Sequence, residues 1–178
     1  MKNQTGFTLV ETMTACVVAF LLFGVAVPAA SSGLEAARAA DARAQLLNSL
    51  MQAASRASFT GTKAVLCPSA DGVLCLNSID WSRGWIVFMD RNSNQEREPD
   101  ETLLHQVSAL KGEVRLNSTQ GRTRIVFQGN GGNAGSNVTF TQCDGRGPGK
   151  ARALIISNSG RLRDAPASAK AAQSTCVK

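Results

Sequence analysis

The chain has 178 residues, of which 43% are hydrophobic and 18% are charged. These numbers suit one folded domain with an appendage, and they exclude a wholly disordered chain. A single His and no Tyr disfavour an enzyme, because His is the commonest general acid or base, although a Ser, Asp or Lys enzyme stays open. Only one apolar run is long enough to span a membrane, which excludes a polytopic membrane protein.

The charge is distributed unevenly along the chain. The formal net charge is +6, but residues 7–104 sum to −3 and residues 105–178 to +8. A basic C-terminal half predicts contact with a polyanion, and a solvated basic face is the alternative interpretation.

The N-terminal segment contains a candidate membrane helix. Residues 12–34 lack Asp, Glu, Lys and Arg, and 23 helical residues extend about 34 Å, enough to cross a bilayer core. Lys2 on the short side predicts that the rest of the chain lies outside the cytoplasm. A cleaved secretory signal ending near residues 27–31 and a lipoprotein signal at Cys16 are alternatives, but both leave the carboxylate of Glu11 unexplained.

The segment GFTLVE at residues 6–11, followed by an apolar helix with Pro28, resembles the N-terminus of type IV pilins and pseudopilins. The resemblance implies that a prepilin peptidase removes residues 1–6, cuts between Gly6 and Phe7, and methylates the new terminus. Residues 7–33 would then be retained, first as a single-pass inner-membrane helix with a periplasmic globular domain. Later they would pack in the core of an extracellular pilus beside other pilins.

Cleavage at this site creates a positive amine on Phe7. An unpaired buried charge is very costly, so we expect Glu11 of one subunit to pair with the Phe7 amine of its neighbour and to set the axial register. Cys16, within the same helix, is interpreted as a small apolar residue.

The helix is predicted to kink at Pro28 and to continue as an amphipathic segment over residues 34–61, ending near residues 58–61. Its apolar stripe, expected to face the globular domain, comprises Ala37, Ala40, Ala44, Leu47, Met51 and Ala54. Short strands are predicted at residues 63–67, 84–89, 101–107, 113–117, 124–128, 137–142 and 151–157. The predicted fold class is therefore α+β, with a long N-terminal helix packed on an antiparallel β-domain at residues 62–163, and a tail at residues 164–178.

Four cysteines, Cys67, Cys75, Cys143 and Cys176, indicate an extracytoplasmic domain. Three pairings are open from the sequence. Cys67–Cys75 with Cys143–Cys176 would pin a loop and tie down the C-terminal tail. A zinc site is the rival interpretation, but the spacings do not match Cys-x-x-Cys knuckles.

The globular part carries a second resemblance. Residues 65–69 (VLCPS), residues 80–90 (DWSRGWIVFMD) and the later Gly160-Arg161 are similar to minor pilins of the FimT/FimU type, which share the GspH domain of type II secretion pseudopilins. The resemblance spans residues 6–163 and implies a helix with two small antiparallel sheets. We expect Trp81 and Trp85 to be core residues.

Three patterns suggest ligand sites but match incompletely. Residues 145–150 fail as a phosphate loop, because Asp144 and Ala151 replace the Gly and the Ser or Thr that it requires. His105 has no nucleophile nearby in sequence. Oxygen-bearing side chains occupy EF-hand-like positions, although Gln95 replaces the turn Gly, at Asp90, Asn92, Asn94, Glu96, Glu98 and Glu101. The stretch is interpreted as a polar hairpin with calcium as the alternative, and we expect no metal, no cofactor and no catalytic residue.

The basic C-terminal half contains Gly160-Arg161-Leu162-Arg163, which resembles the DNA-binding motif of the FimT minor pilins used in natural transformation. We expect Arg146, Lys150 and Arg152 to converge with these arginines, and double-stranded DNA to be the partner, bound through its phosphates. The predicted function is a minor pilin that captures DNA at the pilus tip. The alternatives are a FimU-like assembly adaptor and a type II secretion pseudopilin without DNA binding.

Overall fold

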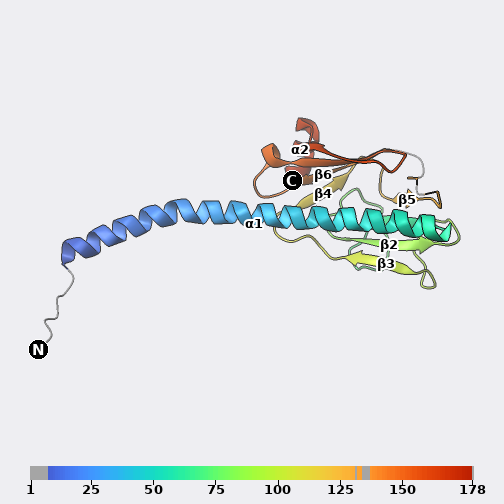
Figure 1. Ribbon diagram of the computed structural model, residues 1–178, viewed down its shortest axis with the longest axis horizontal. Helices are drawn as coiled ribbons and strands as arrows, with labels where there is room; N and C mark the ends of the chain where they lie inside the picture. The colour runs from blue at the N-terminus through green and yellow to red at the C-terminus, as the bar shows by residue number, and fades with distance from the viewer. Residues whose placement is uncertain (1–7, 131, 134–136, 178) are drawn as a thin grey trace, which may run out of the picture. The chain divides into compact units, whose positions relative to one another are not determined.

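The computed structural model describes residues 8–130, 132–133 and 137–177. The chain divides into two compact units, Met1–Leu34 and Glu35–Lys178, and the helix α1 contributes to both (Figure 1). In chain order the elements are α1 (Leu9–Thr60), β1 (Lys63–Pro68), β2 (Trp85–Asp90), β3 (Leu103–Val107), β4 (Arg115–Ser118), β5 (Ile125–Phe127), β6 (Val138–Cys143), the 3-10 turn η1 (Pro148–Lys150), β7 (Arg152–Ile156), β8 (Leu162–Pro166) and α2 (Ala169–Cys176).

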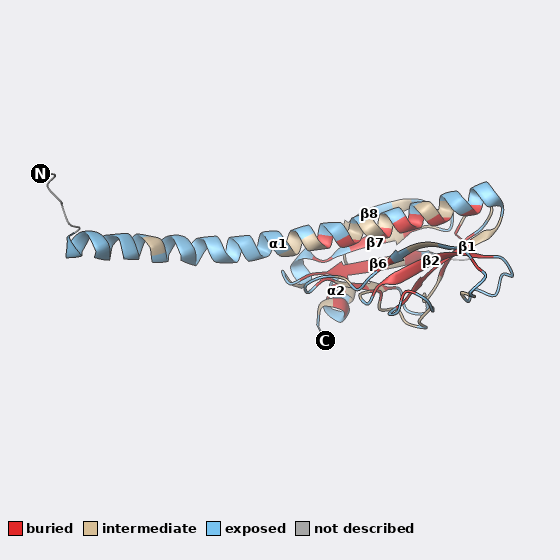
Figure 2. Cartoon of the chain, turned by 90° about the horizontal axis from the view of Figure 1, so that it is seen from below, coloured by how far each residue is buried: buried red, intermediate tan, exposed pale blue. Residues whose placement is uncertain are grey.

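The first unit is built from the N-terminal half of α1, and its large apolar side chains are exposed (Figure 2). Phe20 is 79% exposed and Phe23 66%. The helix is long and apolar enough to cross a membrane, judged by length and composition. So much exposed apolar surface requires lipid or the apolar helices of other subunits around it.

Two threonines interrupt the apolar character of this half-helix without leaving polar groups unpaired. The hydroxyl of Thr12 donates to the carbonyl of Leu9, and that of Thr14 donates to the carbonyl of Glu11, both at 2.9 Å. Hydroxyls bonded back to the helix are tolerated in hydrocarbon, because no donor is then left without an acceptor. The helix is also continuous through Pro28.

The second unit contains two four-stranded antiparallel sheets, with strand orders β3-β2-β1-β5 and β4-β6-β7-β8. One hydrophobic core joins the C-terminal half of α1 to the inner faces of both sheets. Trp81 and Trp85 are fully buried in it, and the ring of Trp81 meets that of Phe140 edge-on at 5.0 Å. The predicted α+β class and the core role of the two tryptophans are therefore confirmed.

The buried face of α1 differs from the predicted stripe. The side chains that are buried are Ala39, Ala42, Leu46, Ser49, Leu50, Ala53 and Ala57. Four members of the predicted stripe are instead exposed, namely Ala37, Ala40, Ala44 and Met51. Alanines lie on every face of this segment, so spacing alone does not single out one face, and the buried face includes the polar Ser49, whose hydroxyl is satisfied inside the core.

The seven predicted strands are present, each within two residues of its expected bounds. Residues 164–178, predicted as a tail tied by a disulfide, contain regular structure, because Leu162–Pro166 forms β8 at the edge of the second sheet and Ala169–Cys176 forms α2. Ser168 begins α2 as an N-cap, with its hydroxyl accepting from the amide of Ala171 at 3.4 Å. The charged residues and Pro166 of β8 suit an edge strand but obscure a period of two in the sequence.

A buried hydrogen bond ties α1 to β2. The indole Nε1 of Trp85 donates to Ser49 Oγ at 2.9 Å, and that hydroxyl donates to the carbonyl of Gln45 at 2.8 Å. Both residues are fully buried, so water cannot replace either partner.

Replacing Ser49 by Ala should destabilise the second unit by about 1–3 kcal/mol, because the buried indole donor loses its acceptor. The matched control is Ser58→Ala, since Ser58 lies on the same helix and bonds its i−4 carbonyl in the same way while exposed to water. The control should change stability by less than about 0.5 kcal/mol. Urea unfolding of the full chain in a non-ionic detergent, followed by fluorescence of the two tryptophans, measures both. Equal shifts would contradict the assignment.

Candidate functional site

The N-terminal motif begins outside the described residues, where Gly6 and Phe7 lie. Glu11 lies in the first turn of α1, exposed, beside a shallow hollow that Thr14, Ala15 and Val18 also line. Within the described residues no cation pairs with this carboxylate. A charge carried on an apolar helix therefore needs its partner from elsewhere.

Two disulfides, Cys67–Cys75 and Cys143–Cys176, join the four cysteines, with Cα atoms 5.5 Å apart in each. The second holds α2 against β6, and α2 also packs on β4 and η1. The disulfide thus clamps the C-terminal helix to the second sheet.

The loop closed by the first disulfide is fixed from within by Asp71. Its carboxylate accepts from the amides of Val73 at 2.8 Å and Leu74 at 3.0 Å, and these bonds, led by that of Leu74, lower the pKa of Asp71. Gly72 packs so closely that a Cβ there would overlap the Gln106 side chain. The loop presents Val73 and Leu74 to solvent.

Arg161 and Arg163 lie at the turn between β7 and β8. Arg163 pairs with Ile155, and the carbonyl of Arg161 accepts from the amide of Ser157 at 3.0 Å. Alternate residues of an extended chain project from one face, so both arginines lie opposite Leu162, which packs on the core. Both are exposed, and within the described residues neither side chain forms an ion pair.

The predicted convergence of Arg146, Lys150 and Arg152 with these two arginines is wrong. Arg152 begins β7, whereas the turn that carries Arg161 follows the end of β7. Arg152 pairs with Pro166, three residues or about 10 Å along the hairpin from Arg163, and side-chain alternation places the two arginines on opposite faces of the sheet. The sequence indicated that both sets of basic residues lie near β7, but not that one set precedes this strand and the other follows it.

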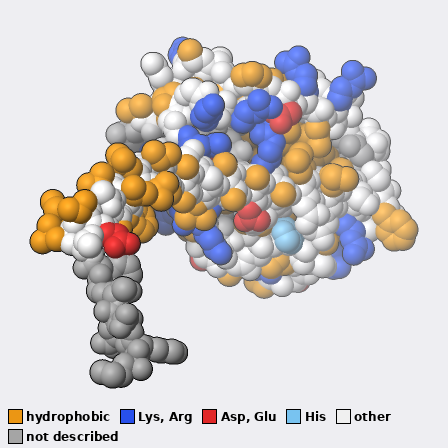
Figure 3. All heavy atoms as spheres, turned by 60° about the vertical axis from the view of Figure 1, so that its left-hand side comes forward, with side chains coloured by type: hydrophobic (Ala, Val, Ile, Leu, Met, Phe, Trp, Pro, Cys, Tyr) orange, Lys and Arg blue, Asp and Glu red, His pale blue; other side chains and the backbone are white. Residues whose placement is uncertain are grey.

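Ion pairs further separate the two groups. Arg146 forms an ion pair with Asp144 at 2.8 Å, and Asp164 bridges Arg152 at 2.8 Å and Arg43 of α1 at 2.6 Å. Lys and Arg side chains are spread over the visible face of the second unit, with an acidic group among the central ones (Figure 3). Of the five predicted DNA-binding residues, two thus have their charge compensated by a carboxylate.

The Asp144–Arg146 pair has the geometry of a strong interaction. Nε and Nη2 of Arg146 each donate to one oxygen of Asp144, at 3.0 and 2.8 Å, and the Arg146 amide donates to the same carboxylate at 2.9 Å. Burial raises the pKa of Asp144, but these hydrogen bonds and the charge of Arg146 outweigh burial and hold that pKa below its ordinary value of 3.8.

The EF-hand-like stretch is organised by its own backbone. Asp90 accepts from the amides of Asn94 and Gln95, at 3.1 and 3.2 Å, and Glu101 accepts from the amide of Arg91 at 2.9 Å. Gln95 adopts φ 62°, the left-handed conformation that favours Gly. Across residues 8–130, 132–133 and 137–177, no cluster of three or more His, Cys, Asp or Glu is arranged to hold a metal ion.

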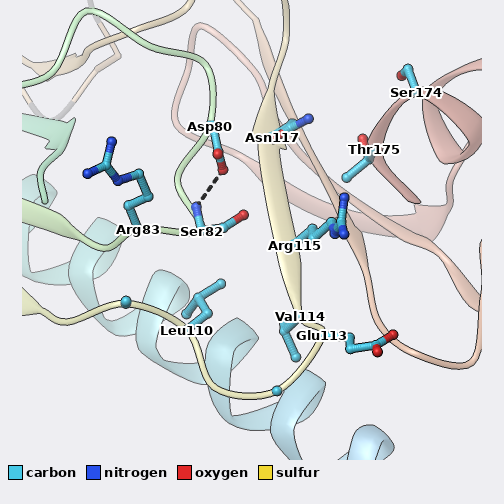
Figure 4. Close-up of a pocket in the computed structure, with 12 residues that line it drawn as sticks. Asp80, Ser82, Arg83, Leu110, Glu113, Val114, Arg115, Asn117, Ser174 and Thr175 are labelled. Atoms are coloured by element: carbon cyan, nitrogen blue, oxygen red, sulfur yellow. Dashed lines mark hydrogen bonds between the residues drawn. The ribbon is translucent and has the colours of Figure 1, made fainter. Parts of the chain in front are cut away.

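A cavity of about 530 Å³ lies between the β1–β2 loop, the β3–β4 loop, β4 and α2 (Figure 4). Its charged lining residues are two arginines, Arg83 and Arg115, and two carboxylates, Asp80 and Glu113. Arg115 points toward Thr175 of α2, while Glu113 points away from it. The charges offset one another, so this cavity does not favour a ligand of either sign.

A helix with an exposed apolar half and a buried half, packed on two disulfide-bonded antiparallel sheets, is the architecture of a membrane-anchored subunit of the pilin class. A family model described as type II transport protein GspH matches residues 42–160, and one described as a prokaryotic N-terminal methylation motif matches residues 1–27. The chain therefore belongs to the GspH family, as a type IV minor pilin or pseudopilin. Its apolar helix anchors it once in the inner membrane, with the globular domain outside, before it enters the pilus.

Solved structures of minor subunits share this fold. The type IV minor pilin FimU of Pseudomonas aeruginosa matches with 18% identity and a TM-score of 0.57, over 82% of this chain and 97% of FimU. The minor pseudopilin EpsH of the Vibrio cholerae type 2 secretion system matches with 14% identity and a TM-score of 0.51, over 72% and 97%. No curated protein sequence matches the chain significantly. At these identities the likeness concerns the fold.

The Asp144–Arg146 pair makes stability depend on pH. Because its pKa is depressed in the folded chain, Asp144 stabilises the fold above its unfolded pKa, and that contribution is lost as the pH falls through the folded value. Asp144→Asn should therefore cost about 1.5–3 kcal/mol at pH 6 and much less at pH 2, measured by urea unfolding. Glu96→Gln, at an exposed carboxylate that forms no ion pair with the residues the structure describes, is the control and should have little effect at either pH. An equal loss for Asp144→Asn at both values would rule out the ion pair as the cause.

Proposed function

We propose that the chain is a minor pilin at or near the tip of a type IV pilus, where it binds double-stranded DNA through Arg161 and Arg163 for uptake in natural transformation. The observation that carries the proposal is the pair of exposed guanidinium groups on one face of the β7–β8 turn, which form no ion pair with any carboxylate in the described part of the chain. The resemblance of residues 160–163 to the FimT motif supports the same assignment.

The proposed contacts are with phosphates rather than bases. A guanidinium group offers a fork of donors that matches two phosphate oxygens, and such contacts carry no sequence information. No Phe, Trp or Tyr occurs after residue 142, so the chain around the two arginines offers no ring on which bases could stack. Duplex DNA of any sequence should therefore bind about as well as single-stranded DNA.

The second candidate is an assembly subunit without DNA binding, either an adaptor between pilus tip and shaft or a type II secretion pseudopilin. The GspH family match and the folds of FimU and EpsH support it. Both candidates are structural rather than enzymatic, and both have other pilins and a prepilin peptidase as partners. They differ in whether the two free arginines meet DNA.

In either case we propose that the chain is cut between Gly6 and Phe7 and that Glu11 pairs with the Phe7 amine of a neighbouring subunit. Support comes from the N-terminal methylation motif and from the position of Glu11, which is a charge on an apolar helix without a cation in the described residues. In a fibre core, two opposite charges of this kind stabilise the packing only as a pair.

Glu11→Gln should leave processing intact but prevent incorporation into fibres, because the size of the side chain is kept and its charge is removed. Processing is measured by mass spectrometry of the membrane fraction, and incorporation by immunoblotting of sheared fibres. Thr14→Ala, one turn further along the helix, is the control and should assemble normally. Fibres that contain the Glu11→Gln protein at wild-type levels would refute the pairing.

The DNA proposal predicts a specific change in salt dependence. Each phosphate contact contributes about −0.9 to the slope of log K against log salt, so Arg161→Gln with Arg163→Gln should make the slope shallower by about 1.8. Fluorescence anisotropy of the full chain in a non-ionic detergent with a labelled 30-base-pair duplex measures it. The control is Lys150→Gln with Lys170→Gln, which removes the same charge from exposed residues away from the β7–β8 turn.

If the control weakens binding as much as the arginine variant, the affinity arises from net charge rather than from the turn. If the arginine variant also fails to enter fibres, the assembly role becomes the better account of these residues. Exposed charges contribute little to stability, so both variants should unfold at the wild-type urea concentration.

A further inference from the structure

A second cavity lies at the end of α1, between its last turns and the adjoining ends of β2 and β3. Its volume is about 320 Å³, and it is lined by Arg56, Thr60, Thr62, Met89, Arg91, Thr102 and Leu104. Both charged lining residues are arginines. The cavity therefore differs from the one beside Arg115, where carboxylates balance the arginines.

The polar groups of this cavity are available to a ligand. Arg56 and Arg91 are exposed, and within the described residues neither guanidinium makes a hydrogen bond or an ion pair. The carboxylates immediately adjacent in sequence to lining residues, Asp90 and Glu101, are buried and accept backbone amides. Asp90 also projects from the opposite face of β2, because side chains alternate along a strand.

The cavity lies at the same end of the second unit as the β7–β8 turn. Gly61 follows the lining residue Thr60, and Gly129 approaches it so closely that a Cβ on Gly129 would lie 2.8 Å from the carbonyl oxygen of Gly61. From that same loop the amide of Asn133 donates to the carbonyl of Asn158, in the β7–β8 turn, at 3.1 Å. A short run of direct contacts thus connects the cavity to the turn that carries Arg161.

We propose that this cavity binds a phosphate group of the DNA backbone and is a second contact for the duplex held by Arg161 and Arg163. The inference rests on the DNA binding proposed above. Two forked guanidinium groups and threonine hydroxyls are the donors that phosphate oxygens accept. The terminal carbonyls of α1 oppose an anion here, so the affinity must come from Arg56 and Arg91.

The test is the salt dependence of duplex binding by the full chain in a non-ionic detergent. With three phosphate contacts, two at the β7–β8 turn and one at this cavity, the binding constant should fall about 40-fold between 50 and 200 mM salt, and Arg56→Gln with Arg91→Gln should reduce that fall to about 12-fold. The charge-matched control, Lys150→Gln with Lys170→Gln, should keep the wild-type fall. Tryptophan fluorescence checks that each variant is folded.

The outcomes distinguish failure of the second phosphate contact from failure of the proposed DNA-binding function. If the wild-type chain does not bind the duplex at 50 mM salt, the proposed function itself fails. If the wild type binds and loses affinity on Arg161→Gln with Arg163→Gln, but not on Arg56→Gln with Arg91→Gln, only the second contact is overturned.

A second measurement uses inorganic phosphate to distinguish a site for free phosphate from a site for DNA. Added at constant ionic strength, it should shift the Nε–H resonances of Arg56 and Arg91 in the wild-type chain, and duplex DNA should shift the same resonances. A site that responds to inorganic phosphate but not to the duplex would take free phosphate, and its assignment to DNA would be wrong.

Discussion

The narrow, alanine-rich face of α1 is the constraint on which the second unit depends. Ala53 and Ala57 pack in the core shared with both sheets, and Ala39 and Ala42 pack beside Val114. Polar groups also reach this face, and the Gln142 side chain donates to the carbonyl of Ala39 at 2.6 Å. Larger residues on this face would push the sheets apart and leave such groups without partners in the core.

The distribution of carboxylates determines which basic residues are free to act. The chain has only three acidic residues after position 104, and two of them, Asp144 and Asp164, are ion-paired to arginines near the β6–β7 loop and α1. The arginines of the β7–β8 turn have no such partner among the described residues. Fixed carboxylates thus compensate Arg146 and Arg152 but not the two arginines of the β7–β8 turn.

The sequence predicted the helices and strands that depend on local residue patterns, and it missed the contacts that depend on which face of an element is buried. Strands β1 to β7 were recognisable because apolar runs are bounded by turn residues, and the membrane helix because 23 residues carry no charge. The burial of Ser49 and the partnership of Asp164 with Arg43 depend on which face of α1 meets the sheets. Spacing alone left that face ambiguous.

The candidate site shows the same division. The sequence identified the Gly160-Arg161-Leu162-Arg163 motif, but it placed Arg146, Lys150 and Arg152 beside that motif because all of them are near β7. Which end of a strand a loop occupies is a property of the hairpin, and β8 was not recognised as its partner. The cavity of Arg56 and Arg91 was equally out of reach, because it brings together residues from α1, β2 and β3 that share no motif.

The continuity of α1 has a mechanical consequence. The chain enters the second unit through α1, so tension applied to the apolar half of the chain reaches the second unit through this helix. Force along the part of α1 that lies in the second unit loads its contacts with the sheets in shear, and the Trp85–Ser49, Gln142–Ala39 and Arg43–Asp164 contacts share it in parallel. A fibre that pulls on this subunit therefore has to break several cross-links together to extract the helix, rather than peel them away one at a time.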